Sequence, residues 1–378
     1  MRLNVTHVWK SSNSGWHSKS IRRVKKHMKS VLVGMSGGVD SSVSAWLLQK
    51  EGLIVHGLSL LFWETRFNSG TNACCSIDSA LDAAKTASML GIGHTTKDVR
   101  VEFMEKVIEP FISGYSNGLT PNPCILCNKY VKFPALLDMA NDMGFDFIAT
   151  GHYAGVLNQR LTMARDVKKD QSYFLYALTR ETLSRLLLPV GGLTKDEVRE
   201  IAKGLLLPAA TRPESQEICF IGGCDYGKFI RDYYGGSRSA APFRQGPIID
   251  MEGNTIGTHN GLYAYTLGQR RRIGIAAKEP LYVIGIDTAT NTLKVGPRCN
   301  AAASECIVGE LNMLVDVSFP AVLDVRIRSA GRNCPAVVSR VDTLRVRVVF
   351  ETPQWPPAPG QSAVFYDKDT VIGGGVIV

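Results

Sequence analysis

The chain of 378 residues is long enough for two or three domains, and 45% hydrophobic with 20% charged residues is typical of a globular protein. Its net charge of +9 is concentrated in residues 1–30, which carry eight basic and no acidic side chains. The rest of the chain is nearly neutral, which argues against a nucleic-acid surface over the whole protein. No apolar run reaches 18 residues, so no transmembrane helix and no membrane partner are expected.

Residues 1–30 form a basic, Ser-rich extension that we expect to be disordered. This composition is typical of organelle transit peptides, but it also suits an RNA-contacting arm or a stretch upstream of a true start at Met28 or Met35. Nine cysteines without a secretory leader predict a reducing compartment. We therefore expect a cytoplasmic protein, or a mitochondrial one if the extension is a transit peptide.

A glycine-rich loop follows the first apolar run. Val31–Val33 predicts a buried strand, the next residues contain Gly34, Gly37 and Gly38, and helical spacing follows up to Gly52. Strand, loop and helix in this order place backbone N–H groups and a positive helix end against a phosphate. The segment lacks the lysine of G-x-x-x-x-G-K-[ST], which argues against γ-phosphoryl transfer. An ordinary glycine-rich turn is the alternative.

The chain up to about residue 209 alternates between predicted strands and helices. Apolar runs at 54–62 and 145–150 predict strands, and helical spacing is present at 77–90, 101–112, 131–143 and 194–204. Thr194 and Glu197 predict a capping box at the start of the last of these helices. This order predicts a doubly wound parallel sheet, whose ligands bind beyond the C-terminal strand ends. Gly34 and Gly151 both follow strands, so both are expected at that edge.

Two cysteines lie in the segment 117–128. Pro121 and Pro123 predict a stiff, extended loop that holds Cys124-x-x-Cys127. In a reducing compartment this spacing indicates metal binding or catalysis. Cys219 lies in an irregular stretch that runs from about residue 208 to 221.

The last part of the chain changes to short alternating runs separated by turns. Leu344, Val346, Val348 and Phe350 alternate with charged residues, as in a half-buried strand. We predict an α/β domain at 31–209, a small β-rich central domain at 210–295 and a C-terminal β-barrel at 296–378.

Several separated motifs together resemble the tRNA-specific 2-thiouridylases, a family within the PP-loop ATP pyrophosphatases. The motifs are Gly34-Met-Ser-Gly-Gly-Val-Asp-Ser41, Thr120-Pro-Asn-Pro-x-x-x-Cys-Asn128, Ala149-Thr-Gly-His-Tyr153, Lys169-Asp-Gln-Ser-Tyr-Phe-Leu175, Ile218-Cys-Phe-Ile221, Tyr265-Thr-Leu-Gly-Gln-Arg270 and Pro359-Gly-Gln-Ser-Ala-Val-Phe-Tyr366. The resemblance implies that the protein adenylates the C2 oxygen of the wobble uridine (U34) of tRNA and replaces it with sulfur. The products would be 2-thiouridine, AMP and pyrophosphate.

The resemblance also implies roles for individual residues. Cys127 would be the nucleophile and Cys219 the persulfide carrier, and the two would form a transient disulfide. In a catalytic domain at 31–209, the ATP contacts would be Gly34, Met35, Ser36, Gly37, Gly38, Val39, Asp40, Ser41, Leu60 and Gly151, and Asp40 could hold the Mg²⁺ that accompanies ATP. The contacts to the target base would be Asn122, Pro123 and Cys124. The tRNA contacts would be His152, Lys169, Asp170, Gln171, Arg328 and Gln361, and the central domain at 210–295 would bind tRNA. Partners would be tRNAs for Lys, Glu and Gln and a sulfur-donor protein, either a cysteine desulfurase or a persulfide relay.

One position departs from the family pattern, because many members have an aspartate where this chain has Cys124. Cys124, Cys127 and Cys219 together are three thiols that suit a [4Fe-4S] cluster with one open iron. Two other functions therefore remain open at this stage. One is a metal-containing tRNA-binding protein, and the other is a different PP-loop enzyme, such as a lysidine synthetase, which has no use for these cysteines.

Overall fold

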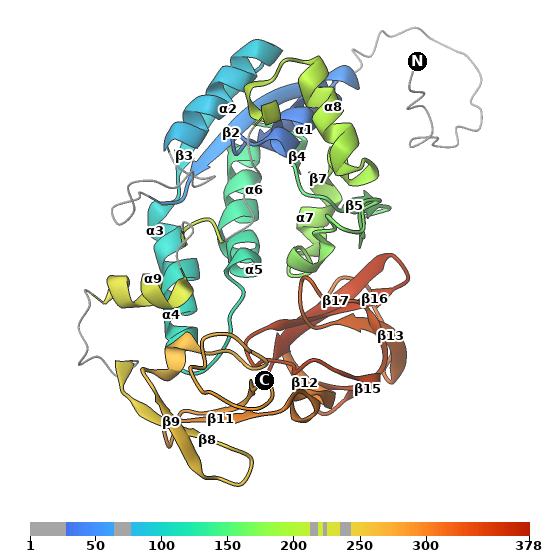
Figure 1. Cartoon of the computed structure of the whole chain (residues 1–378). Helices are drawn as coiled ribbons and strands as arrows, with labels where there is room; N and C mark the ends of the chain where they lie inside the picture. Colours follow the sequence, from blue (N-terminus) through green and yellow to red (C-terminus); the bar gives the residue numbers. More distant parts are fainter. Residues whose placement is uncertain (1–27, 64–76, 212–217, 222–224, 235–242) are drawn as a thin grey trace, which may run out of the picture.

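The computed structural model describes residues 28–63, 77–211, 218–221, 225–234 and 243–378 (Figure 1). The expectations for the basic extension therefore fall almost entirely outside the described residues. The helical elements are α1 (Val39–Lys50), α2 (Ile77–Leu90), α3 (Arg100–Phe103), the π-helix η1 (Met104–Ile108), α4 (Glu109–Ser116), α5 (Pro123–Cys127), the π-helix η2 (Asn128–Lys132), α6 (Phe133–Asp142), η3 (Ser172–Phe174), α7 (Arg180–Arg185), η4 (Pro189–Gly192), α8 (Lys195–Gly204), η5 (Pro208–Thr211), α9 (Tyr226–Tyr233), η7 (Leu262–Ala264) and η8 (Arg298–Ala301).

The strands group into three sheets. They are β1 (Ser30–Gly34), β2 (Ile54–Leu61), β3 (Gly93–Asp98), β4 (Phe147–Thr150), β5 (Gly155–Leu157), β6 (Arg160–Thr162), β7 (Leu186–Leu187), β8 (Gly246–Ile249), β9 (Thr255–His259), β10 (Tyr282–Asp287), β11 (Thr292–Gly296), β12 (Ala303–Met313), β13 (Ala321–Arg326), β14 (Cys334–Arg340), β15 (Val346–Gln354), β16 (Ser362–Asp367) and β17 (Thr370–Ile377).

The N-terminal sheet is parallel, with strand order β3-β2-β1-β4-β7, which confirms the predicted fold class. Strand β1 is buried on both sides: Val31 and Val33 pack with residues of α1 and α2, whereas Leu32 packs with Leu136 of α6. Burial of both faces explains why this strand is continuously apolar. The strand order reverses beside β1, and ligands of such sheets bind at this point.

The segment with the two cysteines differs from its prediction, because α5 begins inside it. Pro123 occupies the first helical position, where its missing N–H removes no hydrogen bond. The Asn122 side chain caps this helix by accepting hydrogen bonds from the backbone N–H groups of Cys124 (3.1 Å) and Ile125 (3.4 Å). The expected extended loop is therefore wrong, and both Cys124 and Cys127 are helical.

The C-terminal part is a closed antiparallel barrel, as predicted. Its strands follow the order β12-β15-β14-β13-β16-β17, and pairing of β12 with β17 closes it. Val346, Val348 and Phe350 of β15 are buried, but Leu344 precedes the strand and is 73% exposed. A separate central sheet has the order β10-β11-β8-β9.

The parallel sheet lies at one end of the molecule and the barrel and the central sheet lie at the other, with α5 between the two ends (Figure 1). The hairpin β5–β6 extends the barrel sheet from the α/β part, where the backbone N–H of Met163 donates to Asp369 O at 2.8 Å. Within the described ranges no helix is long and apolar enough to cross a membrane.

Candidate active site

A pocket of about 230 Å³ opens at the C-terminal ends of β1 and β4, where the strand order reverses. Its walls contain many of the residues expected to contact ATP. The lining residues are Gly34, Met35, Ser36, Asp40, Ser41, Leu58, Leu60, Phe62, Lys132, Leu136, Thr150, Gly151, His152 and Gln171. The apolar side chains of β2 suit a planar base, and the serines of the loop suit phosphate oxygens.

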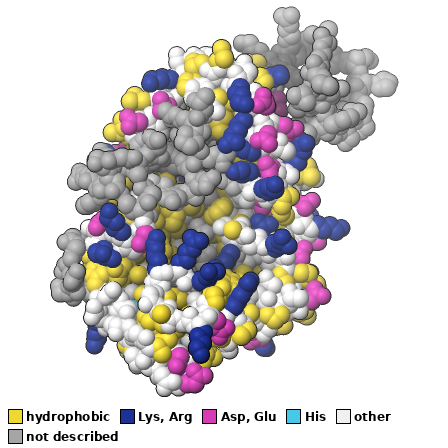
Figure 2. All heavy atoms as spheres, viewed as in Figure 1, with side chains coloured by type: hydrophobic (Ala, Val, Ile, Leu, Met, Phe, Trp, Pro, Cys, Tyr) yellow, Lys and Arg dark blue, Asp and Glu magenta, His cyan; other side chains and the backbone are white. Residues whose placement is uncertain are grey.

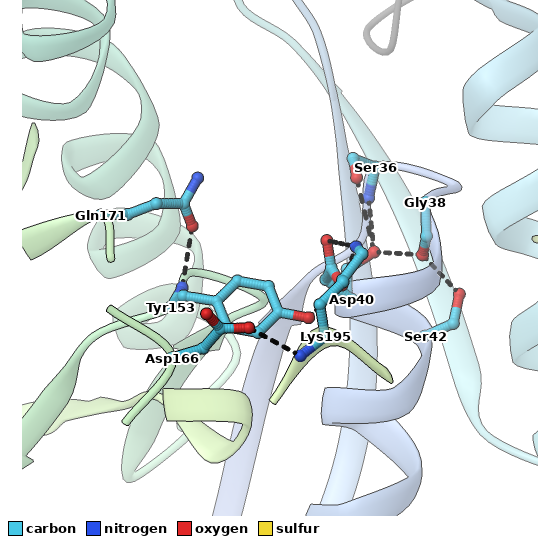
Figure 3. A network of polar contacts seen from close by, with 9 residues as sticks. Ser36, Gly38, Asp40, Ser42, Tyr153, Asp166, Gln171 and Lys195 are labelled. Carbon is cyan, nitrogen blue, oxygen red and sulfur yellow. Dashed lines mark hydrogen bonds and ion pairs between the residues drawn. The ribbon is translucent and has the colours of Figure 1, made fainter. Parts of the chain in front are cut away.

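Hydrogen bonds of serine hydroxyl groups fix the conformation of the loop between β1 and α1. Ser41 Oγ accepts a hydrogen bond from the Ser36 N–H (3.2 Å) and donates to Gly38 O (3.1 Å), while Ser42 Oγ donates to the same carbonyl at 2.9 Å (Figure 3). Gly37 has φ +72°, which favours glycine. No side chain caps the start of α1, so its N-terminal N–H groups suit an anion.

Asp40 was expected to hold a metal ion, and in the structure it is paired with Lys195. The Lys195 ammonium lies 2.6 and 2.9 Å from the two Asp40 carboxylate oxygens, and the Tyr153 hydroxyl donates to Asp40 Oδ1 at 2.8 Å (Figure 3). Lys195 is buried at the start of α8, where Thr194 and Glu197 form the predicted capping box. No sequence pattern points to Lys195, because 155 positions separate it from Asp40.

The donor set suits Mg²⁺ carried by ATP better than a resident metal. Mg²⁺ is commonly bound by one or two carboxylates together with substrate phosphates and water, and Asp40 lies beside the loop that suits phosphate. Among the described residues no group of three or more His, Cys, Asp or Glu side chains could hold a metal. The tentative [4Fe-4S] cluster on Cys124, Cys127 and Cys219 is therefore not supported.

His152 lies in the pocket wall, where its surroundings disfavour the protonated imidazole. Burial, and then the nearby charge of Lys132, hold the pKa of His152 well below its usual range. Its Nδ1 is hydrogen-bonded to Thr150 Oγ1 at 2.7 Å, and its ring stacks on Phe133 with centroids 5.9 Å apart. An uncharged imidazole can serve this pocket by hydrogen bonding rather than as a phosphate counter-ion.

We expect the depressed pKa of His152 to make folding sensitive to acid. Below about pH 6.5 the histidine of the unfolded chain takes up a proton that the folded chain does not, so stability falls as pH falls, by at most about 1.4 kcal/mol per pH unit. Urea unfolding of wild type and His152→Asn between pH 7.5 and 5 measures this slope. The variant should show the shallower decline, and equal slopes would contradict the assignment.

The helix that carries the cysteines is fixed at both ends by other parts of the chain. Before it, the Thr120 N–H donates to Pro359 O (2.7 Å), and Gln361 Nε2 donates to Thr120 O (2.8 Å). After it, Asn128 Nδ2 donates to Phe174 O at 3.0 Å. Gln361, expected to contact tRNA, thus also connects the barrel to this helix.

Cys127 is buried and Cys124 is exposed on α5, whereas Cys219 is half-buried. Cys127 belongs to the main apolar core, and Cys219 packs against the same core. The neighbouring Phe220 ring packs edge-on against Phe111, with centroids 5.4 Å apart, which anchors the segment of Cys219. The structure therefore brings both cysteine-bearing segments to one core, which their separation in sequence does not indicate.

The remaining residues expected to contact tRNA have different surroundings. Lys169 is half-buried, and Gln171 lines the pocket and accepts the Tyr153 N–H at 2.8 Å. The Asp170 side chain is only 1% exposed and forms an ion pair with Arg326 at 2.9 Å. Arg328 donates to Leu267 O (2.9 Å) and Pro356 O (3.1 Å), and burial lowers its pKa.

The fold and this site define an α/β nucleotide-binding protein with a loop suited to pyrophosphate, joined to two β domains. Three family models match in succession: a tRNA methyl transferase HUP domain at 29–223, a tRNA methyl transferase PRC-barrel domain at 238–297 and an aminomethyltransferase β-barrel domain at 303–377. Together with the relatives described next, these matches show that the chain belongs to the family of tRNA-specific 2-thiouridylases.

Three relatives named tRNA-specific 2-thiouridylase MnmA illustrate the similarity. The protein from Pelotomaculum thermopropionicum is 44% identical over 92% of this chain and 96% of its own length. The protein from Acetivibrio thermocellus is 41% identical over 92% and 99%. The protein from Chloroflexus aggregans is 44% identical over 93% and 98%.

Proposed function

We propose that this protein is an ATP-dependent sulfurtransferase that converts the wobble uridine of tRNA to 2-thiouridine. The observation that carries the proposal is the arrangement of the phosphate loop and the Cys127 helix. Lys132, in the π-helix η2 that directly follows α5, lines the same pocket as Ser36 and Asp40. A methyl transferase, the activity in the name of two matching family models, has no need for this loop and two cysteines.

The proposed reaction proceeds in two steps. First, the uridine O2 attacks the α-phosphorus of ATP; a bond forms between O2 and phosphorus, and pyrophosphate leaves with the electrons of the bond that breaks. Then the terminal sulfur of a Cys219 persulfide attacks C2. The Cys127 thiolate attacks the inner sulfur, so that the persulfide bond breaks, a Cys127–Cys219 disulfide forms and AMP leaves. A dithiol reductant would restore both thiols.

The proposed tRNA contacts follow the surroundings of each residue. Asn122, Pro123 and Cys124 form the start of α5, where Cys124 is exposed and where a uridine flipped out of its stack would reach the pocket. Lys and Arg side chains form a band across the face shown in Figure 2, below a hollow lined by hydrophobic side chains. Such a band suits the phosphates of RNA. His152, Lys169, Gln171, Arg328 and Gln361 are proposed as contacts, and Asp170 acts indirectly through its buried ion pair.

The proposal extends to partners and location. The acceptors are tRNAs for Lys, Glu and Gln, the sulfur comes from a cysteine desulfurase or a persulfide relay, and the reaction takes place in the cytoplasm or, if residues 1–30 are a transit peptide, in mitochondria. Residues 210–295 are proposed as a tRNA-binding domain.

Complementation tests the function. Cells that lack their own enzyme should regain wobble 2-thiouridine with the wild-type chain, measured by mass spectrometry of tRNA nucleosides. Cys127→Ser and Cys219→Ser should each reduce it at least about 100-fold, as expected when a nucleophile is removed. Cys299→Ser, which alters an exposed cysteine in η8, is the matched control and should restore the product. Full modification with Cys219→Ser would refute the persulfide role.

A further inference from the structure

Lys132 is a cation in the pocket wall that the motifs do not include. Among the described residues that line the pocket, it is the only Lys or Arg side chain. ATP carries several negative charges, and the loop lacks the lysine that ordinary ATP loops provide. Lys132 is therefore the pocket side chain best able to balance that charge.

The backbone around Lys132 departs from a regular helix between it and Cys127. Residues Asn128–Lys132 form a π-turn in which the Phe133 N–H donates to Asn128 O, five residues earlier. The extra residue rotates the following side chains by about 100° relative to an unbroken α-helix. Cys127 remains in the apolar core while Lys132 lines the pocket. Such π-turns are frequent at functional sites.

The surroundings of Lys132 favour a phosphate ligand. Lys132 and His152 line the same pocket, and after burial the charge of Lys132 is the second cause of the lowered pKa of His152. The loop Ser36–Ser41 and the start of α1 suit the pyrophosphate that leaves. Lys132 lies in the π-helix that directly follows the helix of Cys127, so a base that reacts at Cys127 would bring its O2 and the α-phosphate to the Lys132 side of the pocket.

We propose that Lys132 is a further catalytic residue, whose ammonium group binds the α-phosphate of ATP and stabilises the charge that develops there during adenylation. This inference rests on the proposed function. As the bond from the uridine O2 to the α-phosphorus forms and the bond to the pyrophosphate oxygen breaks, the non-bridging oxygens gain negative charge. A fixed cation next to them stabilises this state more than the ground state.

Single-turnover release of pyrophosphate, measured with saturating ATP and tRNA, tests the role. We expect Lys132→Met to slow release at least about 100-fold, while the dissociation constant for ATP rises less than about tenfold, because the contact strengthens in the transition state. Lys129→Met is the matched control on the same π-turn; the Lys129 ammonium lies 4.9 Å from the Tyr130 ring, and release should match the wild type. A wild-type rate in Lys132→Met would overturn the inference.

Two further variants separate charge from structure. Lys132→Arg keeps the charge and Lys132→Gln removes it with a side chain of similar length, and circular dichroism establishes that each is folded. An active Arg variant beside an inactive Gln variant supports the catalytic role, whereas equal rates overturn it. If the wild type itself releases no pyrophosphate with tRNA present, the proposed function fails. If the wild type releases pyrophosphate and the Lys132 variants release it at the same rate, the proposed function stands and this inference fails.

Discussion

Gly151→Ala is expected to remove nearly all ATP-dependent activity. A Cβ at this position would lie 2.5 Å from the Ser41 backbone nitrogen and 2.7 Å from the Asp40 carbonyl carbon, so α1 and the phosphate loop would have to move. Because a displacement of about 1 Å can reduce a rate about 100-fold, we expect at least that loss in pyrophosphate release. Titration with ATP measures any loss of ATP binding, and a pyrophosphate assay measures the loss of rate.

Gly204→Ala is the control for this substitution. Gly204 ends α8, and a Cβ there meets no atom within 4 Å. Its ATP binding and activity should equal those of the wild type, and the helix gains at most about 1 kcal/mol from the better helix former. Unchanged ATP use by Gly151→Ala would show that the close contact between β4 and the loop does not constrain the site.

Arg326→Leu is expected to destabilise the protein by about 3–5 kcal/mol, the usual cost of removing one partner of a buried ion pair. The side chains of Arg326 and Asp170 are 7% and 1% exposed, and the pair connects β13 of the barrel to the segment before η3. The Asp170 carboxylate would keep its hydrogen bonds from the Ala164 and Ser172 N–H groups, at 3.0 and 3.2 Å, but lose its counter-charge. Urea unfolding measures the loss.

An exposed ion pair of the same barrel provides the comparison. Arg347 pairs with Glu305 on the surface, where the two side chains are 51% and 46% exposed. Exposed pairs contribute about 1 kcal/mol or less, so Arg347→Leu should change stability little. Similar losses for the two substitutions would mean that burial does not determine the contribution of the Asp170–Arg326 pair.

Local pattern was sufficient for the parallel sheet and for several helix ends. Val31–Val33, the glycines that follow and the Thr194–Glu197 capping box all depend on residues only a few positions apart, and the structure confirms these elements. The prediction for Pro121–Cys127 was wrong for a local reason as well. A proline stops a helix in its interior but starts one at its first position, and Asn122 supplies the cap.

The sequence by itself determined the chemical groups of this protein: a loop suited to pyrophosphate, cysteines at 127 and 219, and an apolar pattern that requires a sheet buried on both faces. Only the tertiary structure decided which charges meet in the pocket. Lys195 reaches Asp40, Lys132 enters the wall beside His152, and Asp170 is buried against Arg326. Each of these contacts joins residues from separate elements, so it depends on how those elements pack. No periodic pattern in the sequence predicts it.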